Sequence, residues 1–252
     1  MSNGVGSPEY APDLYDRLLA DVQRLRGATY LEDGAVSAAE LTADGRQVSS
    51  ADTRSWHVLS VDAGGTVRGC ARYLPHGNRV SFSDLMLRKA ALARHPVWGG
   101  KLRQAVEADV ALARRRRVEY VEVGGWALHE IARCTREALR IALATYALSR
   151  SLGGCIGIST VTVRHCSAAI LQKIGGRFLE FSNTPMPQYY DPQYRCEMAL
   201  LRFDSNETNP RYTSCMEELC LQFPAVPVLH KSAHQADQAA WQFIAEGMLA
   251  CA

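Results

Sequence analysis

A glutamate beside a pair of glycines is the most chemically suggestive feature of the sequence. Residues 121–126 read Val-Glu-Val-Gly-Gly-Trp, so that Glu122 stands just before Val123, Gly124 and Gly125. The residues before the glycines alternate as in a β-strand, and glycines within a strand tend to bulge or splay it. A splayed strand leaves backbone N–H and C=O groups without a neighbour, and an extended, amide-rich ligand could bind to them.

Acyl transfer from a pantetheine thioester is one chemistry that this segment could support. The pantetheine arm is extended and rich in amides, and a backbone N–H near the bulge could polarise the thioester carbonyl as an oxyanion hole does. The carboxylate of Glu122 could accept a proton from an attacking ammonium, directly or through water. A glycine bulge at a structural bend, with a solvated glutamate beside it, is the alternative.

Arg72 is a second candidate, because it lies in a strand-like segment of small or apolar residues. An arginine that faces the core needs a carboxylate partner. Asp52, Glu122 or a substrate carboxylate would suit its guanidinium group. An arginine on the outer surface is the alternative. His57, on the neighbouring segment, is more simply explained as a structural histidine than as a base.

Positive charge gathers at two predicted helix ends. Thr135 is a suitable N-cap, and Arg133 and Arg136 flank it. A helix N-terminus can bind phosphate through its free N–H groups, although an ordinary capped helix explains the residues equally well. The arginine run 114–117 ends another helix, where cations are favourable. It is either a solvated terminus or a docking patch for an acidic carrier protein.

The elements that must position these residues alternate between helices and strands. Apolar periodicity predicts helices over 11–26, 99–115, 135–150 and 165–174. Strands are predicted over 55–62, 66–73, 118–123, 155–163 and 196–203. Gly27 is expected to stop the first helix. This alternation predicts a layered α/β domain with a mixed sheet.

The two ends of the chain differ from this central part. Residues 1–10 are rich in Gly, Ser and Pro, and are expected to be a disordered N-terminus. Residues 11–204 are then the folded domain. Residues 205–252 are expected to be a helical extension that packs on it, with helices at about 213–221 and 234–250.

Composition excludes several classes of protein. Hydrophobic residues make up 47% and charged residues 21% of the 252, which argues against disorder. A net charge of +2 is too small to indicate nucleic-acid binding. No run approaches the roughly 20 apolar residues of a membrane span. With no secretory signal and no zinc-type spacing, the eight cysteines indicate reduced thiols in a cytoplasmic protein without a metal site.

Four short motifs follow one another between residues 24 and 203: Arg26 with Tyr30, Asp52 before Ser55-Trp56-His57, Gly69 with Arg72, and Glu122 before Trp126. Their order and spacing resemble those of the GNAT superfamily, and look closest to the autoinducer (acyl-homoserine-lactone) synthases and the N-acyl amino acid synthases. The resemblance implies a GNAT-like three-layer α/β fold with a mixed, splayed central sheet, to which the C-terminal helical extension is added. It also implies an N-acyltransferase.

The resemblance assigns roles to individual residues. Glu122 would be the base, with the backbone of Gly124 and Gly125 beside it. The amine-substrate side would be formed by Arg26, Asp52, Ser55, Arg72 and Trp126. The thioester would be held by Val123, Arg133, Thr135 and Arg136. An acyl-CoA or acyl-phosphopantetheine thioester would act as co-substrate, and no cofactor would be bound permanently.

Three departures from the family pattern bear on the substrates. Gly125 stands where the family has an arginine, which implies a different amine. Arg136 replaces the middle glycine of the pyrophosphate-binding loop, which favours a carrier-protein thioester over acyl-CoA. Leu171 takes the place of the tyrosine that protonates the leaving thiolate. A thiol with a pKa of about 8.5 still leaves tolerably unaided.

The leading hypothesis is direct attack by a small amine, such as an amino acid, on the thioester, without a covalent acyl-enzyme. The acyl chain would occupy an apolar tunnel beyond the splayed strands, and an acyl-carrier protein is a possible partner. One alternative is an acetyl-CoA-dependent GNAT N-acetyltransferase. Another is a non-catalytic sensor that binds an acyl group or CoA on the same fold.

Overall fold

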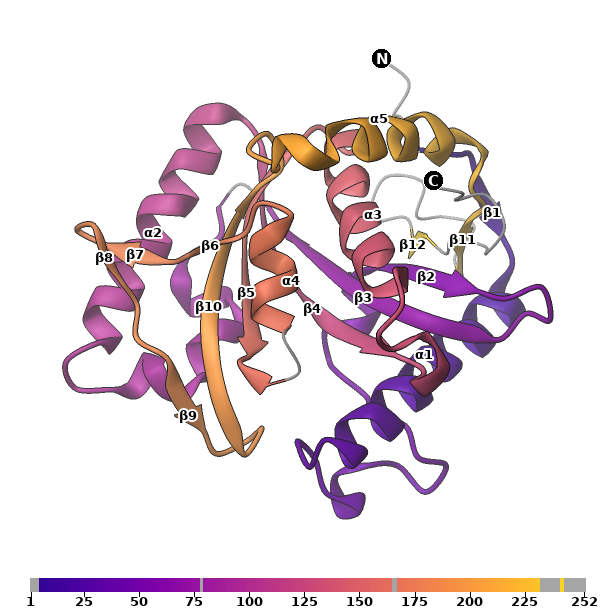
Figure 1. The fold of residues 1–252 in the computed structure, drawn as a ribbon, viewed down its shortest axis with the longest axis horizontal. Helices are drawn as coiled ribbons and strands as arrows, with labels where there is room; N and C mark the ends of the chain where they lie inside the picture. Colours follow the sequence, from indigo (N-terminus) through magenta and orange to yellow (C-terminus); the bar gives the residue numbers. More distant parts are fainter. Residues whose placement is uncertain (1–4, 78, 165–166, 232–240, 243–252) are drawn as a thin grey trace. The chain divides into compact units, whose positions relative to one another are not determined.

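The chain folds into two units, and each unit is built from stretches that are separate in the sequence. The computed structural model describes residues 5–77, 79–164, 167–231 and 241–242. Unit 1 contains the chain up to Leu74, Gly125–Leu152 and the chain from Thr213 onward, and unit 2 contains Pro75–Gly124 and Gly153–Tyr212. Two strands, β3 and β4 in Figure 1, pass from one unit into the other. Both units take residues from 11–204, which the sequence predicts as one domain.

Unit 1 is built on an antiparallel hairpin with a helix on each face. Strand β2 (Trp56–Val61) pairs antiparallel with β3 (Val67–His76), and β4 (Glu119–Leu128) enters this unit at Gly125. Helix α1 (Pro12–Glu32) packs against Cys70 of the hairpin. A side chain at Gly69 would instead meet Ile141 of helix α3 (Glu137–Ser151). Because neighbouring residues of a strand face opposite sides, α1 and α3 form two outer layers.

The chain ends of unit 1 form a small sheet of their own. Strand β1 (Pro8–Tyr10) runs parallel to β11 (Val228–His230), which pairs with β12 (Trp241–Gln242). Figure 1 shows helix α5 (Thr213–Gln222) passing across the end of α3, against which it packs.

Predictions for the chain ends are met in part. The predicted helix at 213–221 is confirmed by α5. The helix predicted at 234–250 lies outside the described residues, apart from 241–242, which are extended. The predicted disorder of residues 1–10 does not hold for 8–10, because their backbone pairs with β11, and residues 1–4 lie outside the described part.

Unit 2 contains a mixed sheet with a helix on each face. Strand β4 runs parallel to β5 (Cys155–Thr162), and β5 runs antiparallel to β10 (Cys196–Asp204). Two short strands, β6 (Arg177–Phe178) and β9 (Tyr189–Asp191), pair antiparallel with β10. Strands β7 (Glu180–Phe181) and β8 (Thr184–Pro185) form a separate pair.

Helices α2 (Gly99–Arg116) and α4 (Ser167–Lys173) cover opposite faces of this sheet. Arg202 of β10 reaches Asp109 of α2, whereas the next residue, Phe203, lies beside Gly176 after α4. Alternation along β10 therefore separates the two helices into outer layers. The predicted fold class, a three-layer α/β fold with a mixed central sheet, is confirmed.

Short 3₁₀ turns connect the longer elements. Three follow one another between β3 and α2: η3 (Phe82–Asp84), η4 (Met86–Lys89) and η5 (Ala91–Arg94). Others are η1 (Ala38–Glu40), η2 (Asp52–Arg54), η6 (Glu130–Ala132), η8 (Pro210–Tyr212) and η9 (Phe223–Ala225). Turns this short carry no apolar periodicity, so the sequence does not predict them.

Gly27 does not stop the first helix, which is a correction to the sequence prediction. Helix α1 continues to Glu32. A Cβ atom at Gly27 would collide with the carbonyl oxygen of Gly45, and the neighbouring Gln47 donates its backbone N–H to the Gln23 carbonyl at 2.9 Å. The glycine is therefore required because a loop packs directly on the helix backbone.

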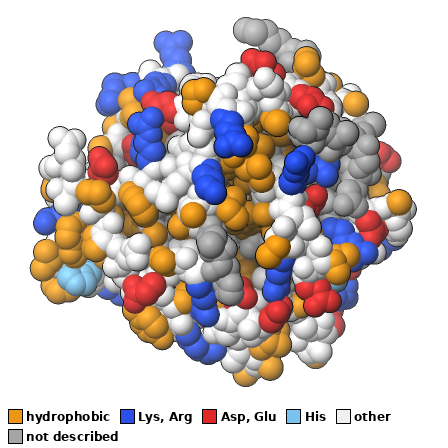
Figure 2. All heavy atoms as spheres, viewed as in Figure 1, with side chains coloured by type: hydrophobic (Ala, Val, Ile, Leu, Met, Phe, Trp, Pro, Cys, Tyr) orange, Lys and Arg blue, Asp and Glu red, His pale blue; other side chains and the backbone are white. Residues whose placement is uncertain are grey.

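Two features of the structure bear on the predictions from composition: the charge of the surface and the polarity of the helices. Acidic and basic side chains are interspersed over the face drawn in Figure 2. Every helix in the described part of the chain is too short or too polar to span a lipid bilayer.

Candidate functional site

The pairing between β4 and β5 ends beside Glu122. Their parallel register runs from Glu119 opposite Cys155 to Glu122 opposite Ile158. Strand β5 continues to Thr162, and its remaining residues pair with β10. The sheet of unit 2 therefore parts at the position where the sequence predicts a splay.

Glu122 is buried and holds three hydrogen bonds, so the alternative of a solvated glutamate is wrong. Its Oε2 accepts from the backbone N–H of Met86 at 2.9 Å and lies 2.9 Å from Nε2 of His76. Its Oε1 accepts from the backbone N–H of Leu87 at 2.8 Å. Met86 and Leu87 are the first residues of η4, and both donate their backbone N–H groups to this carboxylate. The carboxylate therefore holds the start of this turn.

A buried ion pair forms the centre of a second cluster, in unit 1. The Arg26 guanidinium donates from Nη1 to Oδ1 of Asp52 at 2.8 Å and from Nη2 to Oδ2 at 2.6 Å. Both side chains are 1% exposed. Asp52 also accepts from Gln23 Nε2 at 3.0 Å and from the Ser49 backbone N–H at 2.9 Å. The bidentate geometry and the additional donors stabilise a charge that would be costly to bury alone.

The electrostatics of this cluster fix its charges. Burial alone would raise the pKa of Asp52, but the hydrogen bond and charge of Arg26 lower it to about 2. Burial would likewise lower the pKa of Arg26, and the hydrogen bond to Asp52 raises it overall. Burial lowers the pKa of His57 to about 4, and its Nε2 lies 2.9 Å from the Asp52 carbonyl oxygen. His57 is thus neutral at pH 7, which fits its interpretation as a structural histidine.

Arg72 and Gly125 lie against this ion pair. Nη1 of Arg72 is 3.6 Å from Oδ1 of Asp52, so Asp52 is a carboxylate partner of the kind that the sequence requires. Gly125 has a φ of 61°, in the left-handed region, and a Cβ atom there would lie 3.1 Å from Cβ of Arg72 and 3.4 Å from Nη1 of Arg26. The thiol of Cys70 donates to the Gly125 carbonyl at 3.3 Å. Glycine at 125 therefore suits both the backbone and the limited space beside the two arginines.

The sequence predicts Ser55 and Trp126, like Arg72, as contacts of the amine substrate. The Ser55 hydroxyl donates to the carbonyl oxygen of Ala51 at 2.7 Å, next to Asp52. The indole Nε1 of Trp126 is buried, and no hydrogen-bond partner for it exists among the described residues. Unit 1 therefore brings together Arg26, Asp52 and Arg72, and Ser55 bonds to the residue that precedes Asp52.

The residues predicted to bind phosphate stand before α3. Arg133 donates from Nη2 to Glu32 at 2.7 Å and from Nε to the Leu128 carbonyl at 3.3 Å. Thr135 is not the N-cap that the sequence predicts, because α3 begins at Glu137 and its N-cap is Arg136, although the Thr135 hydroxyl accepts the Glu137 backbone N–H at 3.1 Å. Arg136 is exposed. Val123 and Gly124, predicted to contact the thioester, are half-buried on β4.

Two arginines of the 114–117 run are engaged within unit 2. Arg114 donates to the carbonyl oxygen of Val80 at 2.6 Å, and Arg116 pairs with Asp204 at 2.5 Å. Arg115 and Arg117 are exposed. A docking patch for an acidic carrier protein stays a prediction.

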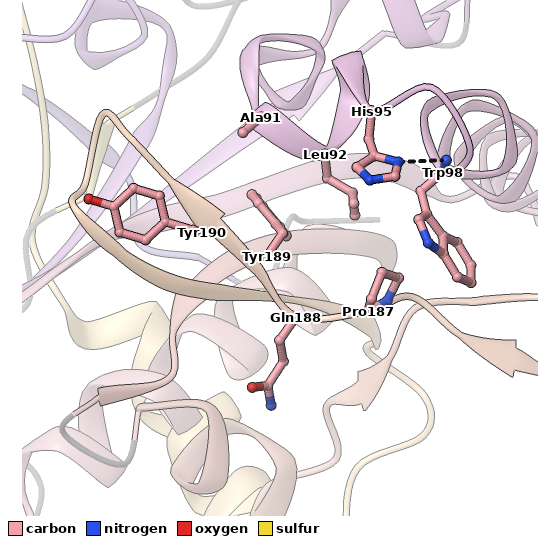
Figure 3. Close-up of a pocket in the computed structure, with 8 residues that line it drawn as sticks. All are labelled: Ala91, Leu92, His95, Trp98, Pro187, Gln188, Tyr189 and Tyr190. Carbon is pink, nitrogen blue, oxygen red and sulfur yellow. Dashed lines mark hydrogen bonds between the residues drawn. The ribbon is translucent and has the colours of Figure 1, made fainter.

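A hollow of about 330 Å³ lies in unit 2 between the segment from η5 to Trp98, which precedes α2, and the segment from Pro187 into β9 (Figure 3). Aromatic residues line much of it, among them Trp98, Tyr189 and Tyr190. His95 also lines it, but its Nδ1 accepts the backbone N–H of Trp98 at 3.3 Å, the contact dashed in Figure 3. None of the residues that the sequence singles out lines this hollow. The predicted apolar tunnel for an acyl chain stays a prediction.

The sequence motifs do not single out Gln23, which contacts Asp52, or His76, which contacts Glu122. Gln23 stands three residues before Arg26 on α1, a spacing that places both side chains on one helix face. His76 stands four residues after Arg72 on β3, a spacing that places both on one strand face. Either spacing could have identified these residues.

Comparison with known proteins finds solved structures of similar fold but no related sequence. No protein-family model matches the sequence, and a search of curated protein sequences gives no match. Among solved structures, the CoA-dependent acyl-homoserine lactone synthase BjaI, with SAM and isopentyl-CoA, is 14% identical, with a TM-score of 0.54. The match covers 82% of this chain and 84% of that one.

Two further solved structures have the same fold. TofI, in a ternary complex with an inhibitor and MTA, is 16% identical with a TM-score of 0.51, and the match covers 80% of this chain and 90% of that one. Arylalkylamine N-acetyltransferase 2 from Aedes aegypti is 13% identical with a TM-score of 0.50, over 78% and 96% of the two chains. At these identities the likeness concerns the fold.

Proposed function

We propose that this chain, which has the fold of the GNAT-like acyltransferases, transfers an acyl group from a pantetheine thioester to the amine of a small molecule such as an amino acid. The observation that carries the proposal is the end of the β4–β5 ladder at Glu122. A strand that leaves its neighbour there has backbone groups available for an amide-rich ligand. A buried carboxylate stands at the same residue.

The proposed reaction is direct attack, without a covalent acyl-enzyme. The thioester carbonyl is polarised by backbone N–H groups of β4 near Val123, Gly124 and Gly125. The amine loses its proton to the cluster formed by Glu122 and His76, whose Oε2 and Nε2 atoms lie 2.9 Å apart. Either acyl-CoA or an acylated carrier protein supplies the acyl group, and Arg133, Thr135 and Arg136 are the proposed contacts for its phosphate.

The arginine cluster of unit 1 is the proposed anchor for the amine substrate. Asp52 is held by Arg26 and Gln23, so its charge is compensated within the protein. Arg72 is more accessible, with 13% of its side chain exposed against 1% for Arg26. A guanidinium group at such a position suits a carboxylate, which an amino acid carries beside its amine. Ser55 and Trp126 stay proposed contacts of this substrate.

The test incubates the purified protein with acetyl-CoA, with a long-chain acyl-CoA or with a long-chain acylated carrier protein, each against a panel of amino acids and simple amines. We expect one thioester to yield an N-acylated product and an equal amount of free thiol, both measured by mass spectrometry. Turnover with acetyl-CoA alone would favour an ordinary N-acetyltransferase. Thioester binding without thiol release for any amine would contradict the proposal and favour a sensor.

A further inference from the structure

We infer that His76 is the general base of the proposed acyl transfer and that Glu122 positions its imidazole ring. This inference rests on the proposed function. His76 ends β3, and its Nε2 lies 2.9 Å from Oε2 of Glu122. An ionised carboxylate only accepts hydrogen bonds, so the ring nitrogen that faces it must carry the proton. The other nitrogen, Nδ1, then holds the lone pair that a base requires.

The Nδ1 atom of His76 is available for this role. No hydrogen-bond partner for it is described in residues 5–77, 79–164 and 167–231, and it is not one of the fully enclosed polar atoms. Two other histidines differ in this respect. His57 is completely buried, and burial lowers its pKa to about 4. His95 uses its Nδ1 to accept the backbone N–H groups of Val97 and Trp98.

Glu122 is better suited to orient the ring than to take the proton itself. Its two oxygens already accept from His76 and from the backbone N–H groups of Met86 and Leu87. Protonation of the carboxylate would set an O–H group against these donors and release the start of η4. A carboxylate that fixes the tautomer of a neighbouring histidine is the arrangement that other acyl-transfer enzymes use to prepare a base.

The reaction balances with these groups. A substrate ammonium gives one proton to Nδ1 of His76, and the freed nitrogen forms a C–N bond with the thioester carbonyl carbon. The C–S bond breaks, and its electron pair leaves on sulphur. The thiolate takes the second proton of the attacking nitrogen, and His76 releases the first to solvent. The products are an amide, a thiol and one proton.

Three carboxylates act on the imidazole of His76: Glu122 by contact, and Asp84 and Glu119 by their charges. The hydrogen bonds from Ser81 lower the pKa of Asp84, so it is ionised throughout the neutral range. Burial raises the pKa of Glu119. A histidine base should make kcat/KM fall on the acid side of the profile, where the imidazole is protonated.

The experiment compares wild type with His76→Gln and His76→Ala, and uses His95→Gln as the matched histidine control. We expect His76→Gln to lower kcat/KM by about 100-fold or more and to remove the acid limb of its pH profile. Free imidazole should restore part of the activity of His76→Ala, which a misfolded variant would not show. His95→Gln should behave as wild type does.

The outcomes separate the two proposals. An active wild type whose rate and pH profile survive in His76→Gln would overturn the role of His76 and leave the acyltransferase function standing. A wild type that forms no amide from any thioester and amine would overturn the function, and this inference with it.

Discussion

Two of the buried carboxylates, Asp52 and Glu122, are held in opposite ways. Asp52, in unit 1, is neutralised by a bidentate guanidinium and sits beside a second arginine. Glu122, in unit 2, is held by an imidazole and two backbone N–H groups, and no arginine or lysine contacts it among the residues that the structure describes. The permanent charge of an arginine fixes the charge of its partner. A histidine can gain or lose a proton near neutral pH.

This difference assigns separate roles to the two carboxylates: Asp52 anchors arginines, and Glu122 takes part in proton transfer through His76. A carboxylate whose pKa is lowered to about 2 does not exchange protons at pH 7, so Asp52 serves to hold Arg26 and Arg72 in place. Glu122 has no arginine among its hydrogen-bond partners in the described part of the chain and contacts the imidazole of His76, so this pair is the one proposed to move a proton. The comparison predicts a rigid, charge-dependent cluster in unit 1 and a weaker, adjustable one in unit 2.

The largest expected effect on stability comes from the rigid cluster of Arg26 and Asp52. Replacing Arg26 by Met strands the buried charge of Asp52, and we expect the free energy of unfolding to fall by about 3–5 kcal/mol. Urea denaturation measures this change. Arg24→Met is the matched control on the same helix, because the Arg24 side chain is 49% exposed and its ion pairs are screened by solvent. A small loss for Arg26→Met, similar to that of the control, would show that the pair is not a structural anchor.

The pH dependence of stability tests the neutral histidine of the same cluster. The pKa of His57 is lowered to about 4 in the folded protein, against about 6.5 for a free histidine. Between these values the unfolded chain binds more protons, so stability is complete above about pH 6.5 and falls as the pH drops toward 4. The expected loss is about 3 kcal/mol over this window.

Urea denaturation at a series of pH values measures that loss. In His57→Gln, the free energy of unfolding should no longer fall between pH 6.5 and 4, because the substitution removes the titrating group. Wild-type stability that is independent of pH across this window would contradict a neutral, buried His57.

Much of the fold could be predicted from the sequence, because its longer elements carry local patterns. The helices and strands of the α/β core follow apolar periodicity, and the grouping of Arg26, Asp52 and Arg72 is what the resemblance to the GNAT superfamily implies. The pairing of β1 with β11 joins residues that lie 220 positions apart, such as Pro8 and Val228, and no local pattern encodes it.

The surroundings of Glu122 could not be predicted for a related reason. They depend on the start of η4, whose backbone N–H groups carry no residue-specific signal. The sequence shows a glutamate beside two glycines, but not that its oxygens are already occupied. Only the fold of the segment between β3 and α2 decides this, and with it the difference between a base and a residue that positions one.

The smallest expected effect on stability comes from the adjustable cluster of Glu122 and His76. In Glu122→Gln the amide has one oxygen acceptor, so Met86 and Leu87 cannot both keep their present bonds. We expect the free energy of unfolding to fall by about 1–3 kcal/mol, less than for Arg26→Met, because no charge is stranded. Hydrogen exchange at these two amides should accelerate. Glu119→Gln, on the same strand, is the control, since Met86 and Leu87 keep their acceptor. Unchanged exchange in Glu122→Gln would mean that the carboxylate does not hold this turn, and the contrast with Asp52 would then be lost.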